Sequence, residues 1–226
     1  MMDQYERTAR VLGQTAVETL KKSSVILFGV GGVGSYAAEA LVRAGVGKLT
    51  IVDRDVVDET NINRQLIALH STIGMSKVDV AAARYKDIDP TCEIIPLNMD
   101  VTVENIHQFD FTQYDYVMDA IDTVSAKIAI IEAARNANVP VITSMGTGNT
   151  LDSTGFTVDF VEKTSVCPLA RVMRRELKNR NIKGVKAVYS KEIPTMKAVP
   201  PGSVSFVPGA AGLVMAGEAV KTLIEN

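Results

Sequence analysis

The hydrophobic and polar positions along the 226-residue chain form two kinds of segment. Short, continuous apolar runs rich in β-branched residues are typical of strands buried on both faces of a parallel sheet. Longer segments with apolar residues three or four positions apart are typical of helices that pack one side against a core. Strands are therefore predicted over residues 25–30, 48–53, 93–97, 116–121 and 139–144, and helices over residues 35–44, 76–87 and 124–138.

The order of these segments predicts the fold class. A strand followed by a helix and another strand forms a βαβ unit, in which the two strands are parallel and the helix covers one face of the sheet. We therefore predict a Rossmann-like, doubly wound α/β fold with a mostly parallel sheet. An amphipathic helical arm over residues 3–22 precedes the first strand, because Leu12, Ala16 and Leu20 recur at a spacing of four.

The pattern changes after residue 150, where Gly and Pro become frequent. Residues 180–203 predict a long, mobile loop, and the whole chain, residues 1–226, is expected to form a single domain with an antiparallel C-terminal extension. The elements predicted here are an antiparallel strand over residues 156–161, a basic helix over 169–179, a short strand at 185–189 and a helix over 210–224 that follows Pro208 and Gly209.

Composition places the chain among ordinary soluble proteins, with 46% apolar and 22% charged residues. The first twenty residues are polar and do not resemble a signal peptide. No apolar run is expected to reach the roughly 18 residues that a membrane span needs. The longest candidate, residues 207–217, contains Pro208 and several glycines. We therefore expect a cytoplasmic protein with no membrane span.

The cysteines and histidines give no pattern for a metal site. Cys92 and Cys167 belong to no CxxC pair, which argues against a zinc ribbon or a redox pair. The only histidines, His70 and His107, cannot supply a histidine-rich site. Both cysteines are expected to be small buried apolar residues.

The net charge of −2 conceals an uneven distribution. Residues 163–191 contain nine basic residues and a single acid, Glu176, and so carry +8, whereas the rest of the chain carries −10. A segment of this kind is either a solvated helix face or a surface that attracts phosphate groups.

The glycine-rich turn GVGGVG follows a predicted strand and opens a predicted helix, which is the context of a phosphate-binding turn. Gly29 permits the tight turn, Gly31 and Gly32 let the backbone approach a phosphate, and Gly34 lets the helix pack close to the strand. The free N–H groups of the helix then face the anion. Asp53 ends the next strand, 19 residues after Gly34, where a carboxylate can accept both ribose hydroxyls.

The next motif favours a nucleoside triphosphate over a dinucleotide. Asn61, Asn63 and Arg64 lie in the polar sequence NINRQ, and Lys77 follows Arg64 by 13 residues at the start of a predicted helix. A triphosphate needs cations near its phosphates, whereas the pyrophosphate of a dinucleotide is served by the helix dipole. Two solvated surface cations would give the same pattern.

Two aspartates end the fourth predicted strand, at the edge of the sheet where ligands bind in open parallel sheets. Asp119 and Asp122 are both candidates to hold Mg²⁺, which favours one or two carboxylates together with phosphate oxygens. We prefer Asp122, since Asp119 at the strand end can serve a hydrogen bond within the fold. Asp122 can also cap the following helix.

These elements together resemble the ubiquitin-activating-type (ThiF-like) superfamily of adenylating enzymes. The resemblance covers most of residues 5–150 and rests on Arg7, GVGGVG, Asp53 with Asp55, NINRQ, Lys77 and the strand end at Asp122. Within the superfamily the chain is most similar to the threonylcarbamoyladenosine dehydratase branch. The stretches that support the branch are GGVGSYAAEALVRAGVGKLTIVD, TNINRQ, VCPLARVMRREL and SVSFVPGAAGLVMAGE.

The resemblance implies an ATP site with Mg²⁺. By position it assigns phosphate and ribose contacts to the turn glycines, Asp53, Asp55, Asn61, Asn63, Arg64 and Lys77, with Asp122 holding Mg²⁺. It also implies a homodimer in which an arginine of the N-terminal arm reaches the triphosphate of the partner subunit, and it leaves open whether this is Arg7 or Arg10. The residues implied in catalysis are Arg7 or Arg10, Arg64, Lys77 and Asp122.

The implied reaction is the ATP-dependent cyclisation of N6-threonylcarbamoyladenosine in tRNA, through an acyl-adenylate and with loss of water. The basic segment then becomes the candidate tRNA surface, with Arg171, Arg174, Arg175 and Lys178 on its helix. Three alternatives stay open: activation of a small ubiquitin-like sulfur-carrier protein, a nicotinamide dehydrogenase, and a nucleotide-binding module without catalysis. The absence of CxxC pairs weighs against the first, and a sulfur-transfer protein remains a possible partner.

Overall fold

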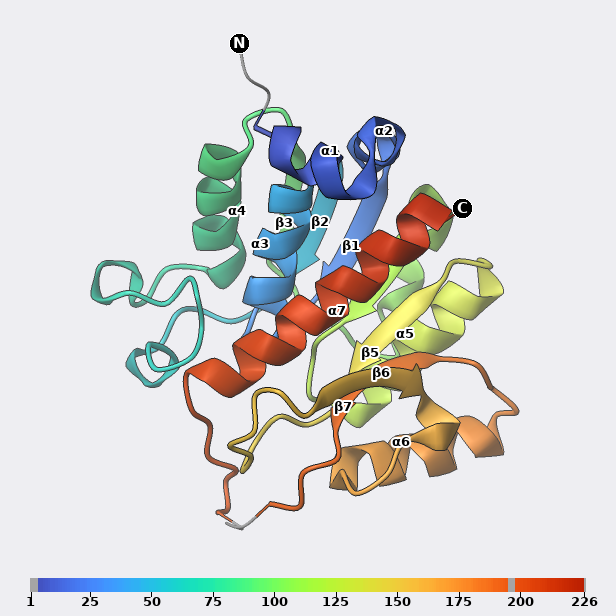
Figure 1. The fold of residues 1–226 in the computed structure, drawn as a ribbon. Coiled ribbons are helices and arrows are strands. Elements are labelled where there is room, and N and C mark those ends of the chain that lie inside the picture. Colours follow the sequence, from blue (N-terminus) through green and yellow to red (C-terminus); the bar gives the residue numbers. More distant parts are fainter. Residues whose placement is uncertain (1–3, 195–197, 226) are drawn as a thin grey trace.

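A central seven-stranded sheet organises the chain (Figure 1). The computed structural model describes residues 4–194 and 198–225. The strand order is β3-β2-β1-β4-β5-β7-β6, and every neighbouring pair is parallel except β7 and β6. This confirms the predicted fold class. The strands are β1 (Ser24–Phe28), β2 (Lys48–Val52), β3 (Glu93–Leu97), β4 (Tyr116–Asp119), β5 (Val141–Ser144), β6 (Phe156–Phe160) and β7 (Lys186–Ser190).

Helices cover both faces of this sheet and create two apolar cores. Alternate residues of a strand point to opposite faces, so Val25 and Leu27 of β1 join one core while Ile26 and Phe28 join the other. The first core lies under α2 (Gln14–Lys22), α3 (Gly34–Ala44), α4 (Lys77–Ile88) and α7 (Phe206–Glu225), and the second under α5 (Val124–Asn136) and α6 (Pro168–Asn179).

The predicted helical arm over residues 3–22 is confirmed from residue 6 onward, but it is divided into two short helices. Its first residues, 1–3, lie outside the described residues. Helix α1 (Glu6–Leu12) ends and α2 begins at Gly13, whose φ of 90° no helix can contain. Glycine reaches this backbone conformation without the steric cost of a side chain.

The last helix begins earlier than predicted, at Phe206 rather than after Gly209. Pro208 lies in the first turn, where a backbone N–H has no helical partner, so its missing donor costs nothing. The expectation that Pro208 and the glycines shorten the apolar run was therefore wrong. By length and composition α7 would suffice to cross a membrane, but half of its apolar window is buried inside the fold.

Part of the predicted loop over residues 180–203 is a strand of the sheet. Strand β7 pairs with β5 on one side and with β6 on the other, close to the short strand predicted at 185–189. Helix α7 then begins near the middle of the sheet, where Pro208 lies against Gly32 of the turn after β1. Residues 195–197 of the predicted loop lie outside the described residues.

Helix α7 packs so closely against α3 that one of its glycines has no room for a side chain. A Cβ atom at Gly212 would lie 2.3 Å from the carbonyl oxygen of Val33 and 3.1 Å from the backbone nitrogen of Ala37. At Gly217 of the same helix, a Cβ atom would have nothing within 4 Å. A substitution at Gly212 therefore tests the packing of the two helices, whereas one at Gly217 tests helix propensity alone.

We predict that Gly212→Ala lowers the free energy of unfolding by about 1–3 kcal/mol, because overpacking shifts α7 away from α3. Gly217→Ala is the matched control and should raise it by up to about 1 kcal/mol, since alanine favours the helix. Urea denaturation of both variants measures the difference. Equal effects of the two substitutions would contradict the close approach of the helices.

Candidate active site

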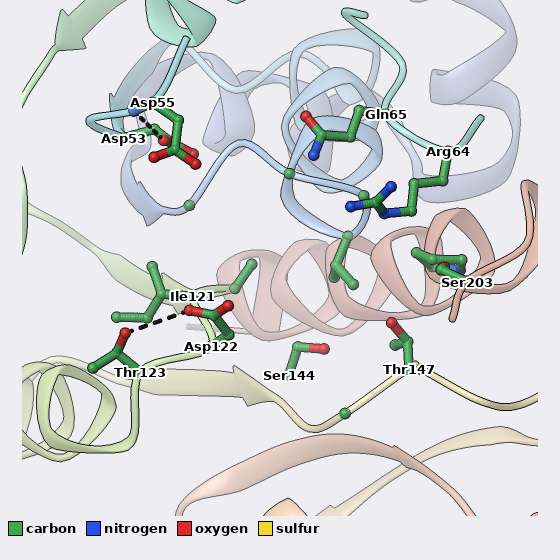
Figure 2. Close-up of a pocket in the computed structure, with 18 of the residues that line it drawn as sticks. Asp53, Asp55, Arg64, Gln65, Ile121, Asp122, Thr123, Ser144, Thr147 and Ser203 are labelled. Carbon is green, nitrogen blue, oxygen red and sulfur yellow. Dashed lines mark hydrogen bonds between the residues drawn. The ribbon is translucent and has the colours of Figure 1, made fainter. Parts of the chain in front are cut away.

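A cavity of about 600 Å³ opens at the carboxyl ends of the parallel strands, between the loops that follow β1, β2, β4 and β5 (Figure 2). In a doubly wound sheet this edge is where the chain leaves each strand and where ligands bind. The segment before α7 closes one side of the cavity with Pro201, Gly202 and Ser203. Residues far apart in the sequence thus meet at one edge of the sheet.

The glycine turn between β1 and α3 is shaped by close backbone contacts. Gly29 has a φ of 89°, and a Cβ atom there would lie 2.8 Å from the carbonyl oxygen of Ala120. A Cβ atom at Gly34 would lie 1.8 Å from the carbonyl oxygen of Gly29, so α3 can start here only without a side chain. Gly29, Gly31 and Gly32 line the cavity, whereas Gly34 lies behind them. The turn therefore offers bare backbone to an anion.

Asp53 holds the glycine turn from the end of β2. Its Oδ2 accepts a hydrogen bond from the Val30 amide at 2.7 Å, and its Oδ1 accepts one from the Asp55 amide at 2.9 Å. Both carboxylates line the cavity. Lys77, at the start of α4, is 6% exposed and donates from Nζ to Asp55 Oδ2 at 2.7 Å. A cation and two carboxylates therefore meet at this end of the cavity.

A short 3₁₀ helix, Glu59–Asn61, presents the next polar residues. The side chain and the amide of Thr60 donate to Asp58, and these hydrogen bonds lower the pKa of the Asp58 carboxyl. The ionised carboxyl caps the helix, and Asn61 Oδ1 accepts from the Asp58 amide in return, at 3.2 Å. The cap orients buried Asn61 toward the cavity.

Arg64 reaches the cavity from the end of this loop. Its Nη1 donates to the carbonyl oxygen of Thr60 at 2.8 Å and to Asn63 Oδ1 at 2.9 Å. Asn63 does not itself line the cavity. Its Nδ2 donates to the carbonyl oxygen of Ser203 at 3.0 Å, so Asn63 ties Arg64 to the segment before α7.

The two aspartates after β4 have different environments. Asp122 is exposed and lines the cavity, with its Oδ1 3.4 Å from the Thr123 hydroxyl (Figure 2). Asp119 is completely buried and accepts from Lys127 Nζ at 3.0 Å and from Thr143 Oγ1 at 2.6 Å. Only Asp122 is therefore placed to contact a bound group.

Lys127 and Asp119 form a buried ion pair beneath the cavity. Lys127 Nζ also donates to the carbonyl oxygen of Ser144 at 2.8 Å, and Asp119 Oδ1 accepts from the Ile121 amide at 3.2 Å. The pair consequently links the loop after β4, which carries Asp122, to the loop after β5. Neither side chain has any exposed surface, so the charges depend on each other and on these hydrogen bonds.

No group of three metal-ligating side chains occurs among the described residues. A divalent cation at this site would need oxygen ligands from a bound phosphate in addition to one or two carboxylates. Asp122 on the cavity wall fits that requirement. Both cysteines are buried, as predicted.

The predicted arm arginines lie away from the cavity of their own chain. Arg7 and Arg10 are on α1, at the opposite end of the sheet from the cavity (Figure 1), and neither lines the cavity. Arg10 pairs with Glu6 of the same helix. Within one chain, the structure therefore does not bring these arginines to Arg64 and Lys77.

Helix α6 buries Ala170, Met173 and Leu177 and exposes a basic face. Arg171, Arg175 and Lys178 lie on that exposed face, three or four positions apart. Arg174 differs from them, because its Nη1 donates to both the carbonyl oxygen and the hydroxyl of Thr164 at 2.8 Å. Of the four predicted basic residues, Arg174 therefore makes hydrogen bonds that stabilise the fold itself.

Several cavity residues were not singled out from the sequence. Gln65 lies in the NINRQ motif and is 7% exposed, with its Oε1 buried and unpaired among the described residues. The loop Ser144–Gly148 follows β5, and the rule that ligands bind at strand ends would have indicated it. Lys127, a cation within the apolar first half of an Ala- and Ile-rich helix, was the signal for the buried ion pair. Nothing in the sequence indicated Ser203.

Comparisons with known proteins give a consistent result. The ThiF family profile matches residues 5–226. A tRNA threonylcarbamoyladenosine dehydratase of Bacillus subtilis is 43% identical, over 100% of this chain and 96% of the relative. The enzyme of that name from Escherichia coli is 39% identical over 82% of this chain and 72% of the relative. A crystal structure of the Escherichia coli enzyme in complex with ATP matches with a TM-score of 0.93 and 36% identity, over 98% of this chain and 94% of that chain.

We predict that Lys127→Met lowers the free energy of unfolding by about 3–5 kcal/mol, because Asp119 is left buried without its counter-charge. Lys163→Met is the control, since Lys163 is 62% exposed and lies 3.8 Å from Asp159, and its removal should change stability by less than about 0.5 kcal/mol. Urea denaturation gives both values. A loss below about 1 kcal/mol for Lys127→Met would contradict the structural role of the pair.

Proposed function

Because the chain belongs to the ThiF family, we propose that it is an ATP-dependent tRNA threonylcarbamoyladenosine dehydratase. The observation that carries this proposal is the similarity to such dehydratases along the full length of the chain. The cavity supports it, because the glycine turn, the cations Arg64 and Lys77 and several carboxylates surround the place where a nucleoside triphosphate would bind.

The proposed reaction activates a carboxylate that is otherwise a poor electrophile. A carboxylate oxygen of the threonyl group attacks the α-phosphorus of ATP, and pyrophosphate leaves. The carbamoyl group of the same side chain then attacks the acyl carbon, the bond from that carbon to the bridging oxygen breaks, and AMP leaves with the oxygen while a proton is released. The second step is intramolecular, so it needs no nucleophile from the enzyme.

The chain's own residues supply position and charge. The glycine turn would offer backbone N–H groups to the phosphates, and Asp53, which lines the cavity, would accept the ribose hydroxyls. Arg64 and Lys77 offset the negative charge that develops when pyrophosphate leaves. Mg²⁺ bound at Asp122 would stabilise the same charge on the phosphate oxygens.

We further propose a homodimer in which the arm of one subunit completes the site of the other. Arg7 and Arg10 lie at the far end of the sheet from their own cavity, so they can reach a triphosphate only in a second copy of the chain. Helices α1, α3 and α7 share an apolar groove that contains Tyr36 and Leu213. Leu213 is 55% exposed, which suits this surface to a second subunit.

The basic face of α6 is the proposed tRNA surface. Leu169, on the same helix, lines the cavity, so a phosphate chain along Arg171, Arg175 and Lys178 would bring a nucleoside to the cavity mouth. Contacts between Lys or Arg and phosphates release counterions and make binding dependent on salt. The modified nucleoside then enters while its backbone stays on α6.

We predict that the protein, ATP and Mg²⁺ lower the mass of the modified nucleoside in threonylcarbamoyladenosine tRNA by about 18 Da and form AMP. Arg64→Ala or Lys77→Ala should slow this reaction by roughly 100-fold or more, because the charge on the phosphates is no longer offset. Lys48→Ala, at the amino end of β2, is the control and should leave the rate unchanged.

Mass spectrometry of the digested tRNA follows this reaction. An unchanged nucleoside mass, together with pyrophosphate exchange that requires a carrier protein with a Gly-Gly tail, would move the assignment to sulfur-carrier activation.

We predict that Arg171→Glu combined with Lys178→Glu weakens tRNA binding by at least about tenfold and reduces its salt dependence, since two phosphate contacts are lost. Lys22→Glu combined with Arg135→Glu carries the same change in net charge on α2 and α5 and should bind tRNA nearly as the wild type does. Filter binding at several salt concentrations tests this. Equal losses in both double variants would show a general charge effect and remove the α6 surface.

We predict that two inactive variants restore activity when they form a mixed dimer. Lys77→Ala removes a cavity cation, and Arg7→Ala or Arg10→Ala removes the arm cation. If the arm acts across the dimer, co-expression of one of each yields about a quarter of wild-type activity, because about half of the dimers are mixed and one of the two sites in each mixed dimer is intact. The arginine variant that complements Lys77→Ala identifies the arm residue. No recovery with either variant would contradict exchange of the arm between subunits.

A further inference from the structure

The cavity has a second half that the nucleotide-binding residues do not occupy. It is lined by the loop Ser144–Gly148 after β5, by Leu169 of α6 and by the segment Pro201–Ser203 before α7. Asp122 and the glycine turn lie between this half and the loop after β2, which carries Asp53 and Asp55 (Figure 2). It therefore borders the position at which an α-phosphate would be attacked.

Hydrogen bonds clamp the two polypeptide segments of this second half together. The Asn149 amide donates to the carbonyl oxygen of Gly202 at 2.8 Å, and the Gly202 amide donates to Asn149 Oδ1 at 2.8 Å. Pro201 packs against Gly148, where a Cβ atom would lie 2.8 Å from the proline Cβ. Thr147 and Ser203 flank this clamp, so their spacing is fixed by the hydrogen bonds and packing between the two segments.

The second half is uncharged. Among the described residues, none of the side chains that line it is Lys, Arg, Asp or Glu. It offers three hydroxyls, those of Ser144, Thr147 and Ser203, beside the apolar side chains of Met145, Leu169 and Pro201. A substrate carboxylate would gain no counter-charge here, so the carboxylate is directed to the half that contains Arg64 and Lys77.

Among the described residues, one of the three hydroxyls is buried without a hydrogen-bond partner. Within the described part of the chain, Ser203 Oγ is buried and makes no hydrogen bond. The Ser144 hydroxyl, in contrast, donates to the carbonyl oxygen of Met145 at 3.1 Å. The Thr147 hydroxyl points toward the cavity (Figure 2). A buried polar atom without a partner costs free energy, and a rotation about χ1 that turned Ser203 Oγ to a ligand hydroxyl in the cavity would recover it.

We propose that Ser203 and Thr147 form a subsite for the hydroxyethyl side chain of the threonyl group, with Ser203 as the residue that recognises its hydroxyl. This inference rests on the proposed function. The threonyl group carries one carboxylate, one hydroxyl and one methyl group on neighbouring carbons. With the carboxylate at the phosphate, the hydroxyl meets Ser203 and Thr147, and the methyl group meets the apolar wall of Leu169 and Pro201.

The position of Ser203 also couples substrate recognition to the nucleotide. Asn63 donates to the Ser203 carbonyl oxygen and accepts from Arg64, so the same amide holds the subsite and the phosphate-binding cation. A threonyl group fixed at Ser203 is therefore held at a constant distance from the charge that stabilises the leaving pyrophosphate. This makes Ser203 a specificity residue as well as part of the wall.

The test compares tRNA that carries the threonylcarbamoyl group with tRNA that carries a glycylcarbamoyl group, which keeps the carboxylate but lacks the hydroxyethyl side chain. The quantity measured is kcat/KM for water loss on each tRNA with saturating ATP. Ser203→Ala should lower kcat/KM on the threonyl tRNA by roughly tenfold and leave the glycyl tRNA unchanged, because only the first can lose a hydrogen bond. Thr147→Val should act in the same direction.

Ser205→Ala is the matched control, since Ser205 is exposed two residues away and does not line the cavity. It should keep the wild-type ratio of threonyl to glycyl kcat/KM. A wild-type enzyme that turns over threonyl tRNA, while Ser203→Ala and Thr147→Val both keep the wild-type ratio, would overturn the subsite alone. A wild-type enzyme that removes water from neither tRNA would overturn the proposed function and the subsite with it.

Discussion

The close approach of backbone around the glycine turn is the constraint on which the rest of the site depends. Gly29 lies against the carbonyl oxygen of Ala120, Gly34 against that of Gly29, and Gly32 against Pro208 of α7. Two segments that are distant in sequence, the loop after β4 and the start of α7, thus converge on one turn. Because side chains are excluded from this point, backbone N–H groups remain available to an anion, and the start of α3 is aimed at the cavity.

A buried ion pair stabilises the site from beneath the cavity, where Lys127 and Asp119 join the loops after β4 and β5. The same two loops carry Asp122 on one side and Ser144–Gly148 on the other, so the ion pair fixes the distance between the charged and the uncharged half. The Asn149–Gly202 clamp and Asn63 then attach the segment before α7. The cavity is consequently built from short connections to a rigid sheet, which suits a reaction that depends on positioning.

The features that depend on a few neighbouring residues were predicted correctly from the sequence. Apolar runs located the strands, and the glycine turn with Asp53 located the edge of the sheet at which the cavity opens. It failed where tertiary context overrides local propensity. Gly13 breaks the arm in two, and Pro208 is accommodated in the first turn of α7 because no partner is required there. Ser203 could not be found, since its place on the cavity wall depends on a clamp between segments more than fifty residues apart. The arm arginines do not line the cavity of their own chain, so their part in the site depends on the proposed dimer.

The most direct test of the central claim, that the carboxylate is activated as an acyl-adenylate, follows the carboxylate oxygen. tRNA with ¹⁸O in the threonyl carboxylate would be converted with unlabelled ATP, and AMP, pyrophosphate and phosphate would be analysed by mass spectrometry. Since the bridging oxygen leaves with AMP, we predict one ¹⁸O atom in AMP for each cyclised nucleoside and none in pyrophosphate. Label in inorganic phosphate with ADP as the nucleotide product, or label released as water, would contradict it.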